Sequence, residues 1–133
     1  MTTYPLFPPT AQKVVLVVED SISEAKIISA VLRTCGLAVV CAVDGPDGLQ
    51  KAQEIRPNLI VMDVNMPGMD GFQVVQALKR DPRHADIPIV MLTTSDNPES
   101  VMTGFDAGAI DYIPKDVFAM RVLAETIRQI GLI

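Results

Sequence analysis

The sequence is poor in the residues that build zinc sites and in the basic residues that favour nucleic-acid binding. Its 133 residues include 2 cysteines and 1 histidine, too few ligands for a zinc site. Acidic residues outnumber basic ones by 16 to 11, and the net charge of −5 argues against direct nucleic-acid binding. We predict that Cys35 and Cys41 are free buried thiols in a reducing compartment, which places the chain in the cytoplasm.

Long apolar runs are also missing. No run approaches the roughly 18 residues that a membrane-spanning helix needs, so no membrane contact is expected. The start, "MTTYPLFPPTAQK", lacks the basic stretch and apolar core of a secretory signal. Its three prolines predict a flexible extension over residues 1–12, ahead of one domain over residues 13–133.

What the sequence does have is a regular alternation of short apolar runs and helical stripes. Strands are predicted at 13–18, 37–43, 58–63, 87–94 and 109–115. Helices are predicted at 22–35, 44–55, 71–80, 97–108 and 116–130, the first with a capping box formed by Ser21 and Glu24. This alternation predicts an α/β fold, a doubly wound parallel sheet with helices on both faces.

Polar residues follow the predicted strands where they end. Glu19 and Asp20 follow the first strand, Asp63 ends the third, Thr93 ends the fourth, and Lys115 follows the fifth. In a parallel sheet these ends share one edge, so the three carboxylates would repel one another unless a cation neutralised them. Since only oxygen ligands are available, a hard cation such as Mg²⁺ is expected, and lysine and threonine suit a phosphate.

Each of these residues alone has a plainer interpretation. Glu19 and Asp20 could cap a helix, and Asp63 could be a turn residue. Lys115 could be a solvated loop lysine, and Thr93 an ordinary residue at a strand end. Only their occurrence together at the predicted strand ends favours a site over these alternatives.

Four segments together resemble the response-regulator receiver domains of two-component signalling: "VVED" at 17–20, "VMDVNMPGMDG" at 61–71, "MLTT" at 91–94 and "AGAIDYIPK" at 107–115. The resemblance covers residues 13 to 130. It implies a flavodoxin-like sheet of five parallel strands in the order 2-1-3-4-5.

The resemblance also implies roles for individual residues. Asp63 matches the phosphoacceptor, and Glu19, Asp20, Asp63 and the backbone carbonyl of Asn65 match the Mg²⁺ ligands. Thr93 and Lys115 match the groups that contact the phosphoryl group.

Tyr112 and Thr93 match the switch pair of the family. The implied donor is a histidine kinase or phosphotransfer protein, and the implied output is a changed surface of helix 4, strand 5 and helix 5. That surface would bind a downstream protein, and the fold allows a homodimer through helices 4 and 5. The chain would catalyse only its own phosphorylation and slow dephosphorylation, and would not be an enzyme of metabolism.

Two departures from the family pattern keep an alternative open. Asp116 stands where a proline usually follows the lysine, and Thr94 stands where alanine is common. The alternative is a pseudo-receiver, an interaction module that works without phosphorylation. A haloacid-dehalogenase type of enzyme fits less well, since Asn65 replaces that family's second aspartate. The loop around His84 is predicted to be a surface loop with an exposed histidine.

Overall fold

The computed structural model describes residues 12–94, 102–103 and 106–133. Within these ranges its elements follow one another as β1 (Val14–Val18), α1 (Ile22–Thr34), β2 (Ala38–Ala42), α2 (Gly45–Ile55), β3 (Leu59–Asp63), α3 (Gly71–Arg80), β4 (Ile89–Thr93), β5 (Asp111–Pro114) and α5 (Ala119–Gln129).

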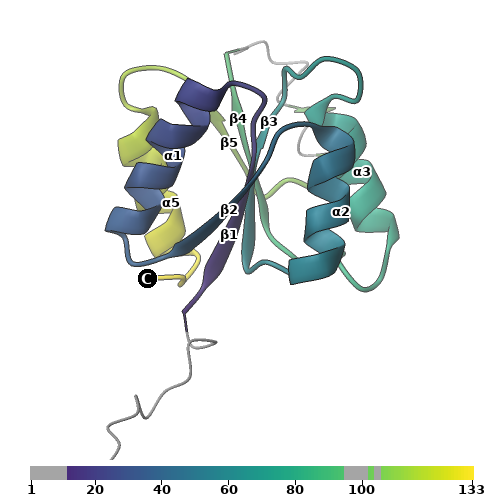
Figure 1. The fold of residues 1–133 in the computed structure, drawn as a ribbon, viewed down its shortest axis with the longest axis horizontal. Coiled ribbons are helices and arrows are strands. Elements are labelled where there is room, and N and C mark those ends of the chain that lie inside the picture. Colours follow the sequence, from purple (N-terminus) through teal and green to yellow (C-terminus); the bar gives the residue numbers. More distant parts are fainter. Residues whose placement is uncertain (1–11, 95–101, 104–105) are drawn as a thin grey trace, which may run out of the picture.

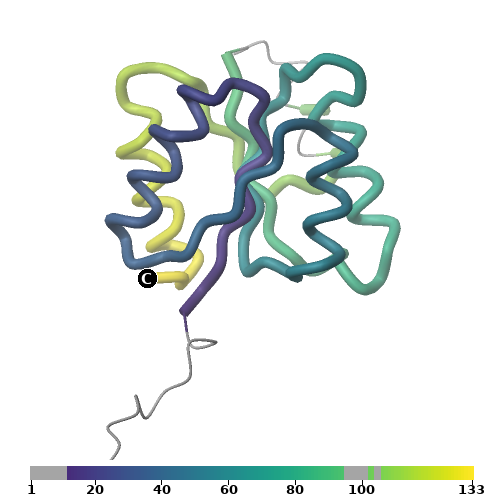
Figure 2. Tube along the Cα trace, in the orientation of Figure 1, coloured from purple at the N-terminus to yellow at the C-terminus, as the bar shows by residue number. Residues whose placement is uncertain are grey.

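The five strands form one parallel sheet in the order β2-β1-β3-β4-β5. This confirms the predicted α/β architecture and the strand order of the flavodoxin-like fold. Helices α1 and α5 cover one face of the sheet, and α2 and α3 cover the other (Figure 1). The trace in Figure 2 shows α1, α2 and α3 each carrying the chain back before the next strand starts. Because all strand pairs are parallel, the strands end at the same edge.

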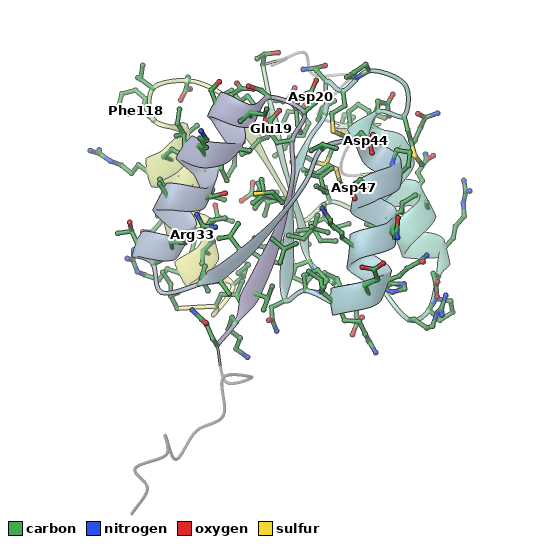
Figure 3. All side chains as sticks on the ribbon, in the orientation of Figure 1. Glu19, Asp20, Arg33, Asp44, Asp47 and Phe118 are labelled. Carbon is green, nitrogen blue, oxygen red and sulfur yellow. The ribbon has the colours of Figure 1, made fainter. Side chains whose placement is uncertain are left out.

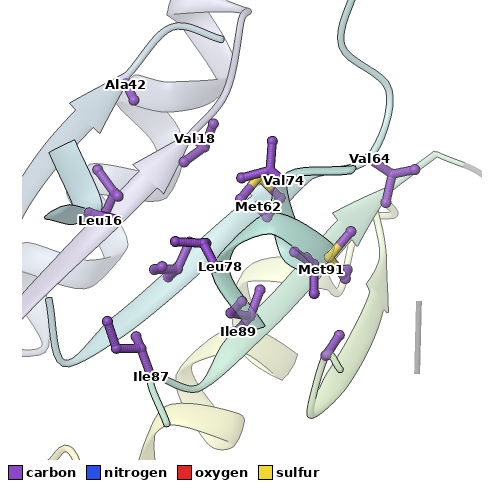
Figure 4. Close-up of a cluster of buried hydrophobic side chains, with 14 of the residues drawn as sticks. Leu16, Val18, Ala42, Met62, Val64, Val74, Leu78, Ile87, Ile89 and Met91 are labelled. Carbon is purple, nitrogen blue, oxygen red and sulfur yellow. The ribbon is translucent and has the colours of Figure 1, made fainter. Parts of the chain in front are cut away.

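Two hydrophobic clusters hold these layers together, because successive side chains of a strand point to opposite faces. Leu16, Met62 and Met91 point to the α2–α3 side, where they pack with Val74 and Leu78 (Figure 4). The neighbouring strand residues point to the α1–α5 side and pack against helix residues there. Burial on both faces explains why these strands appear in the sequence as nearly continuous apolar runs.

Gly48 allows α2 to approach β1 closely. A Cβ placed at Gly48 would lie 2.9 Å from Cγ2 of Val18. Glycine inside a helix costs about 1 kcal/mol relative to alanine. Here the missing side chain makes room for the valine.

Several predictions of element bounds can now be judged. The third helix runs over residues 71–80 as predicted, and β2, β4 and β5 are each shorter than predicted. The predicted fourth helix lies largely outside the described residues, as does the predicted extension over residues 1–12. Cys35 and Cys41 are free thiols, but both are half-buried rather than fully buried.

The prediction of an exposed His84 was wrong. The residue is only 2% exposed. Its backbone N–H donates to the Asp81 carbonyl over 2.9 Å, and its Nδ1 lies 3.3 Å from Asp81 Oδ2. Nearby, Lys79 Nζ donates to the carbonyls of Ala85 and Ile87, both over 2.8 Å, and ties the loop to α3. Although the loop is polar in sequence, its histidine is therefore buried.

Candidate functional site

The carboxyl edge of the sheet brings the predicted site residues together. Glu19 directly follows β1, Asp63 is the last residue of β3, Thr93 the last of β4, and Lys115 directly follows β5. Glu19 and Asp20 lie at this end of the sheet in Figure 3. The prediction that these residues share one edge is confirmed.

Three carboxylates form the acidic part of the site. One oxygen each of Glu19, Asp20 and Asp63 lies within 4.8 Å of the others. Glu19 and Asp63 are 2% and 4% exposed, whereas Asp20 is open to solvent. Clustered oxygen ligands with an open side fit Mg²⁺, which keeps several waters when bound to protein.

Lys115 supplies the positive charge among these carboxylates. Its Nζ lies 2.8 Å from Glu19 Oε1, 3.2 Å from Glu24 Oε2 and 3.3 Å from Asp63 Oδ1. Burial lowers the pKa of Lys115, but the hydrogen bond to Glu19 and the charges of Asp63 and Glu19 outweigh it and leave that pKa raised. The ammonium group is therefore charged at neutral pH.

For Glu19, the effect of burial on the pKa outweighs the effect of the hydrogen bonds. Burial raises its pKa from 4.5 to about 7, although hydrogen bonds from Lys115 and from the Ser21 backbone N–H oppose the rise. The nearby negative charge of Asp63 adds to the effect of burial. A metal-free site thus holds one carboxylate that is partly protonated near neutral pH.

The predicted capping box at the start of α1 forms only in part. The Glu24 backbone N–H donates to Ser21 Oγ over 3.3 Å, as predicted. The Ser21 N–H, however, donates to Glu19 Oε2 over 3.2 Å, and the Glu24 carboxylate pairs with Lys115 instead. A complete capping box occurs at α3, between Asp70 and Gln73, where it was not predicted.

Asn65 contacts the Asp63 side chain from the loop after β3. Its backbone N–H donates to Asp63 Oδ1 over 3.1 Å. Its side-chain Nδ2 donates to Thr93 Oγ1 over 3.1 Å and to Thr94 Oγ1 over 3.0 Å. The loop of β3 and the end of β4 are thereby connected beside Asp63.

Gly71 allows the chain to fold back tightly behind Asp63. A Cβ at this position would lie 2.5 Å from the Asp63 carbonyl oxygen and 3.0 Å from Cα of Val64. The Gly71 N–H donates to the Val64 carbonyl over 3.1 Å, which closes the loop. The second glycine of "MPGMDG" is therefore required by the close approach of backbone to backbone.

The departure at Asp116 leaves the lysine in place. No described peptide bond is cis, so the Lys115–Asp116 peptide is trans. The Lys115 N–H donates to the Thr93 carbonyl over 2.6 Å, and the Asp116 carboxylate accepts from the Phe118 N–H over 2.8 Å. Tyr112, the predicted switch residue, is half-buried on β5 and packs against the cluster on the α2–α3 side.

Comparison with known proteins identifies the family. The model of the response regulator receiver domain matches residues 15–128. The chain belongs to this family. Over 110 residues it is 39% identical to the DNA-binding dual master transcriptional regulator RpaA of Synechocystis sp.. The match covers 83% of this chain and 46% of RpaA, so the chain spans about half the length of that relative.

Solved structures of response regulators share the fold. The chemotaxis response regulator CheY4 of Vibrio cholerae is 38% identical with a TM-score of 0.82, and the match covers 90% of this chain and 98% of the CheY4 chain. The Mn(2+)-bound form of response regulator Rcp1 is 29% identical with a TM-score of 0.78, covering 90% and 94%. Receiver domains bind Mg²⁺ through acidic residues, and this chain has a cluster of three, Glu19, Asp20 and Asp63.

Sequence reasoning missed two contacts of the site. The ion pair between Glu24 and Lys115 joins residues 91 positions apart, and the bond from Asn65 to Thr94 joins residues 29 apart. The sequence predicted Glu24 only as part of a capping box, and Thr94 only as a departure from the alanine that is common in the family. No local pattern in the sequence signals either contact.

Proposed function

We propose that this receiver domain, residues 13–133, is phosphorylated on Asp63 in a Mg²⁺-dependent reaction. Response regulators interact with histidine kinases and downstream targets, so the donor would be a phosphohistidine on a kinase or phosphotransfer protein. The observation that carries the proposal is the site itself, in which Lys115 Nζ lies 3.3 Å from the Asp63 carboxylate inside a cluster of three acids.

The residues present fit Mg²⁺. Oxygens of Glu19, Asp20 and Asp63, with the backbone carbonyl of Asn65, would hold it. When bound, the ion neutralises negative charge on the carboxylates and on the incoming phosphoryl oxygens. The exposed side of Asp20 leaves room for water and for those oxygens.

In phosphoryl transfer, the protein would act mainly by positioning the reacting groups and neutralising their charge. An oxygen of the Asp63 carboxylate bonds to phosphorus as the phosphorus–nitrogen bond of the donor breaks, and its electron pair returns to the imidazole. Oδ1 already accepts from the Asn65 N–H and contacts Lys115, which favours attack by the other oxygen. Lys115 then neutralises charge on the phosphoryl group, and the Thr93 hydroxyl donates to one of its oxygens.

The consequence of phosphorylation would be a changed binding surface. The phosphoryl group carries about −1.5 to −2 charge at neutral pH, which draws Thr93 toward Asp63. Tyr112, on the strand paired with β4, would then change rotamer and alter the surface of β5 and α5 that a target protein binds. This is a signalling switch rather than turnover of a metabolite. Within the described residues, no helix is long and apolar enough to cross a membrane.

The test is labelling by a small phosphodonor. Acetyl phosphate with Mg²⁺ should add one phosphoryl group by intact mass, and beryllofluoride should shift the NMR signals of Thr93 and Tyr112. Asp63→Asn should abolish both effects, as should a chelator. Equal labelling of Asp63→Asn would refute the assignment of the acceptor.

The trans peptide between Lys115 and Asp116 supports one competing proposal, a pseudo-receiver that binds its partner without phosphorylation. It predicts Mg²⁺ binding without an adduct, or an adduct without shifts at Thr93 and Tyr112. Replacing Asp116 by proline would then restore the response only if this peptide limits it.

A further inference from the structure

Glu24 contacts the lysine of the site from the first turn of α1. Its Oε2 lies 3.2 Å from Lys115 Nζ, although the two residues are 91 positions apart in the sequence. The main chain of Glu24 is fixed by the start of the helix, because its N–H donates to Ser21 Oγ over 3.3 Å. The carboxylate that meets Lys115 is therefore carried by a rigid element of the fold.

The Lys115 ammonium group is shared among three carboxylates. An ammonium group has three protons to donate. The acceptors near Nζ are Glu19 Oε1 at 2.8 Å, Glu24 Oε2 at 3.2 Å and Asp63 Oδ1 at 3.3 Å. Among the described residues, the acids close enough to share a metal ion are Glu19, Asp20 and Asp63. Of the three acceptors of Lys115, only Glu24 lies outside the group that would hold Mg²⁺.

We propose that Glu24 is a positioning residue that keeps the Lys115 ammonium group beside Asp63 while the other carboxylates hold Mg²⁺, and that it speeds phosphorylation in this way. This inference rests on the proposed phosphorylation of Asp63 and deepens it. In this role Glu24 contacts neither the phosphoryl group nor the ion, and it acts through Lys115.

The surroundings of Lys115 provide no second anchor of this kind among the described residues. Lys115 borders a cavity of about 220 Å³ between α1 and α5. Apolar side chains form much of its wall, including Ile28, Leu92 and Ala119. The other acid in the wall besides Glu24 is Asp116, whose carboxylate already accepts from the Phe118 N–H over 2.8 Å. Without Glu24, the ammonium group faces apolar wall or solvent on this side.

The size of the effect follows from the flexibility and exposure of the pair. A lysine side chain has a flexible four-carbon stem, so its ammonium group must be held in one of many positions to meet a phosphoryl oxygen. The Glu24 side chain is 44% exposed and that of Lys115 13%, so solvent screens part of their attraction. We expect loss of the pair to slow labelling at saturating Mg²⁺ and donor by about 2-fold to 10-fold, as for one net hydrogen bond.

The experiment measures how fast acetyl phosphate labels the protein at saturating Mg²⁺, followed by intact mass. Glu24→Gln removes the charge and keeps the size of the side chain. Glu24→Asp keeps the charge, but it is one methylene shorter and withdraws the carboxylate from Lys115. Both variants should be labelled more slowly than the wild type. Loss of a negative charge by itself would act the other way in Glu24→Gln, because it favours an anionic donor.

Asp44→Asn is the matched control for charge. Asp44 follows β2 and lies at the same end of the sheet as Glu19 (Figure 3). It caps α2 by accepting the Asp47 N–H over 2.8 Å, and among the described contacts it makes none to Lys115. Asparagine caps a helix about as well as aspartate. Asp44→Asn should therefore be labelled at least as fast as the wild type.

A second readout needs neither metal nor donor. In chelator, the NMR signals of the Lys115 ammonium group and of the CH₂ group next to it should shift in Glu24→Gln and in Glu24→Asp. The same signals should stay at their wild-type positions in Asp44→Asn. Urea unfolding of the three variants shows whether each one keeps the fold, so a change in Lys115 can be told from a general loss of structure.

The outcomes separate the inference from the proposed function. A labelling rate in Glu24→Gln equal to or above that of the wild type would overturn the inference, as would unchanged Lys115 signals in metal-free Glu24→Gln. A Glu24→Asp variant that behaves as the wild type would also overturn it, because charge rather than contact would then matter. Absence of any Asp63 label on the wild-type protein would overturn the proposed function, and this inference with it.

Discussion

The raised pKa of Glu19 predicts an unusual pH dependence of stability in the metal-free protein. Burial is the main cause, and it shifts the pKa of this carboxyl from 4.5 to about 7. Because the folded-state pKa lies above the unfolded value, the stabilising contribution is complete below pH 4.5. This contribution is lost as the pH rises toward 7. In that range the unfolded protein has released the Glu19 proton, whereas the folded protein must either keep the proton or bury a charged carboxylate.

The size of the effect follows from the two pKa values. The interval from 4.5 to about 7 corresponds to about 3 kcal/mol of unfolding free energy. Other groups also titrate, so the wild type is compared with Glu19→Gln, which keeps the shape and cannot ionise. In chelator, the stability of the wild type relative to Glu19→Gln should fall by about 3 kcal/mol between pH 4.5 and pH 7.5.

Urea unfolding of both proteins across this pH range measures the difference directly. Mg²⁺ should reverse the trend in the wild type, because it binds the ionised carboxylate and stabilises the folded state more at pH 7.5 than at pH 5. A difference between wild type and Glu19→Gln that stays constant with pH would refute the reasoning, as it would mean that Glu19 titrates normally in the fold.

Three further predictions concern packing and charge near the site. Gly71→Ala should destabilise the protein by about 1–3 kcal/mol in urea unfolding, because the new Cβ meets the carbonyl oxygen at the end of β3; an unchanged midpoint would mean that the loop can move aside. Gly48→Ala should also lower stability despite its better helix propensity, and Val18→Ala added to it should recover part of the loss, since the two side chains compete for one space. Glu24→Gln should change stability by less than about 1 kcal/mol, because its ion pair with Lys115 is partly exposed; a larger, salt-independent loss would contradict a surface pair.

Much of the fold was predictable because its signals are local. The strands of a buried parallel sheet appear as continuous apolar runs, and the helices between them show a period of 3.6 residues. The edge at which Glu19, Asp63, Thr93 and Lys115 meet follows from topology, since parallel strands place all their carboxyl ends together. The polar residues at the strand ends are therefore predictable as neighbours from the sequence alone.

The contacts that sequence reasoning missed depend on which of several partners a side chain selects in three dimensions. His84 lies in a polar loop, yet only 2% of its surface is exposed. The loop folds against α3, where Lys79 donates to the Ala85 and Ile87 carbonyls. Asn65 has many potential partners in its turn, and only the pairing of β3 with β4 brings Thr94 within 3.0 Å of it. Such choices are settled by tertiary packing, which local patterns do not encode.

Glu24 illustrates how tertiary charge can override a local motif. Its sequence position favours a bond to the Ser21 N–H, but Glu19 already accepts that proton over 3.2 Å. Glu24 is therefore free to approach Lys115, a cation with only 13% of its side chain exposed. A charge-assisted bond to an ammonium group is stronger than one to a neutral N–H, so the ion pair prevails. The same carboxylate that would complete a helix cap instead helps to hold the lysine of the site.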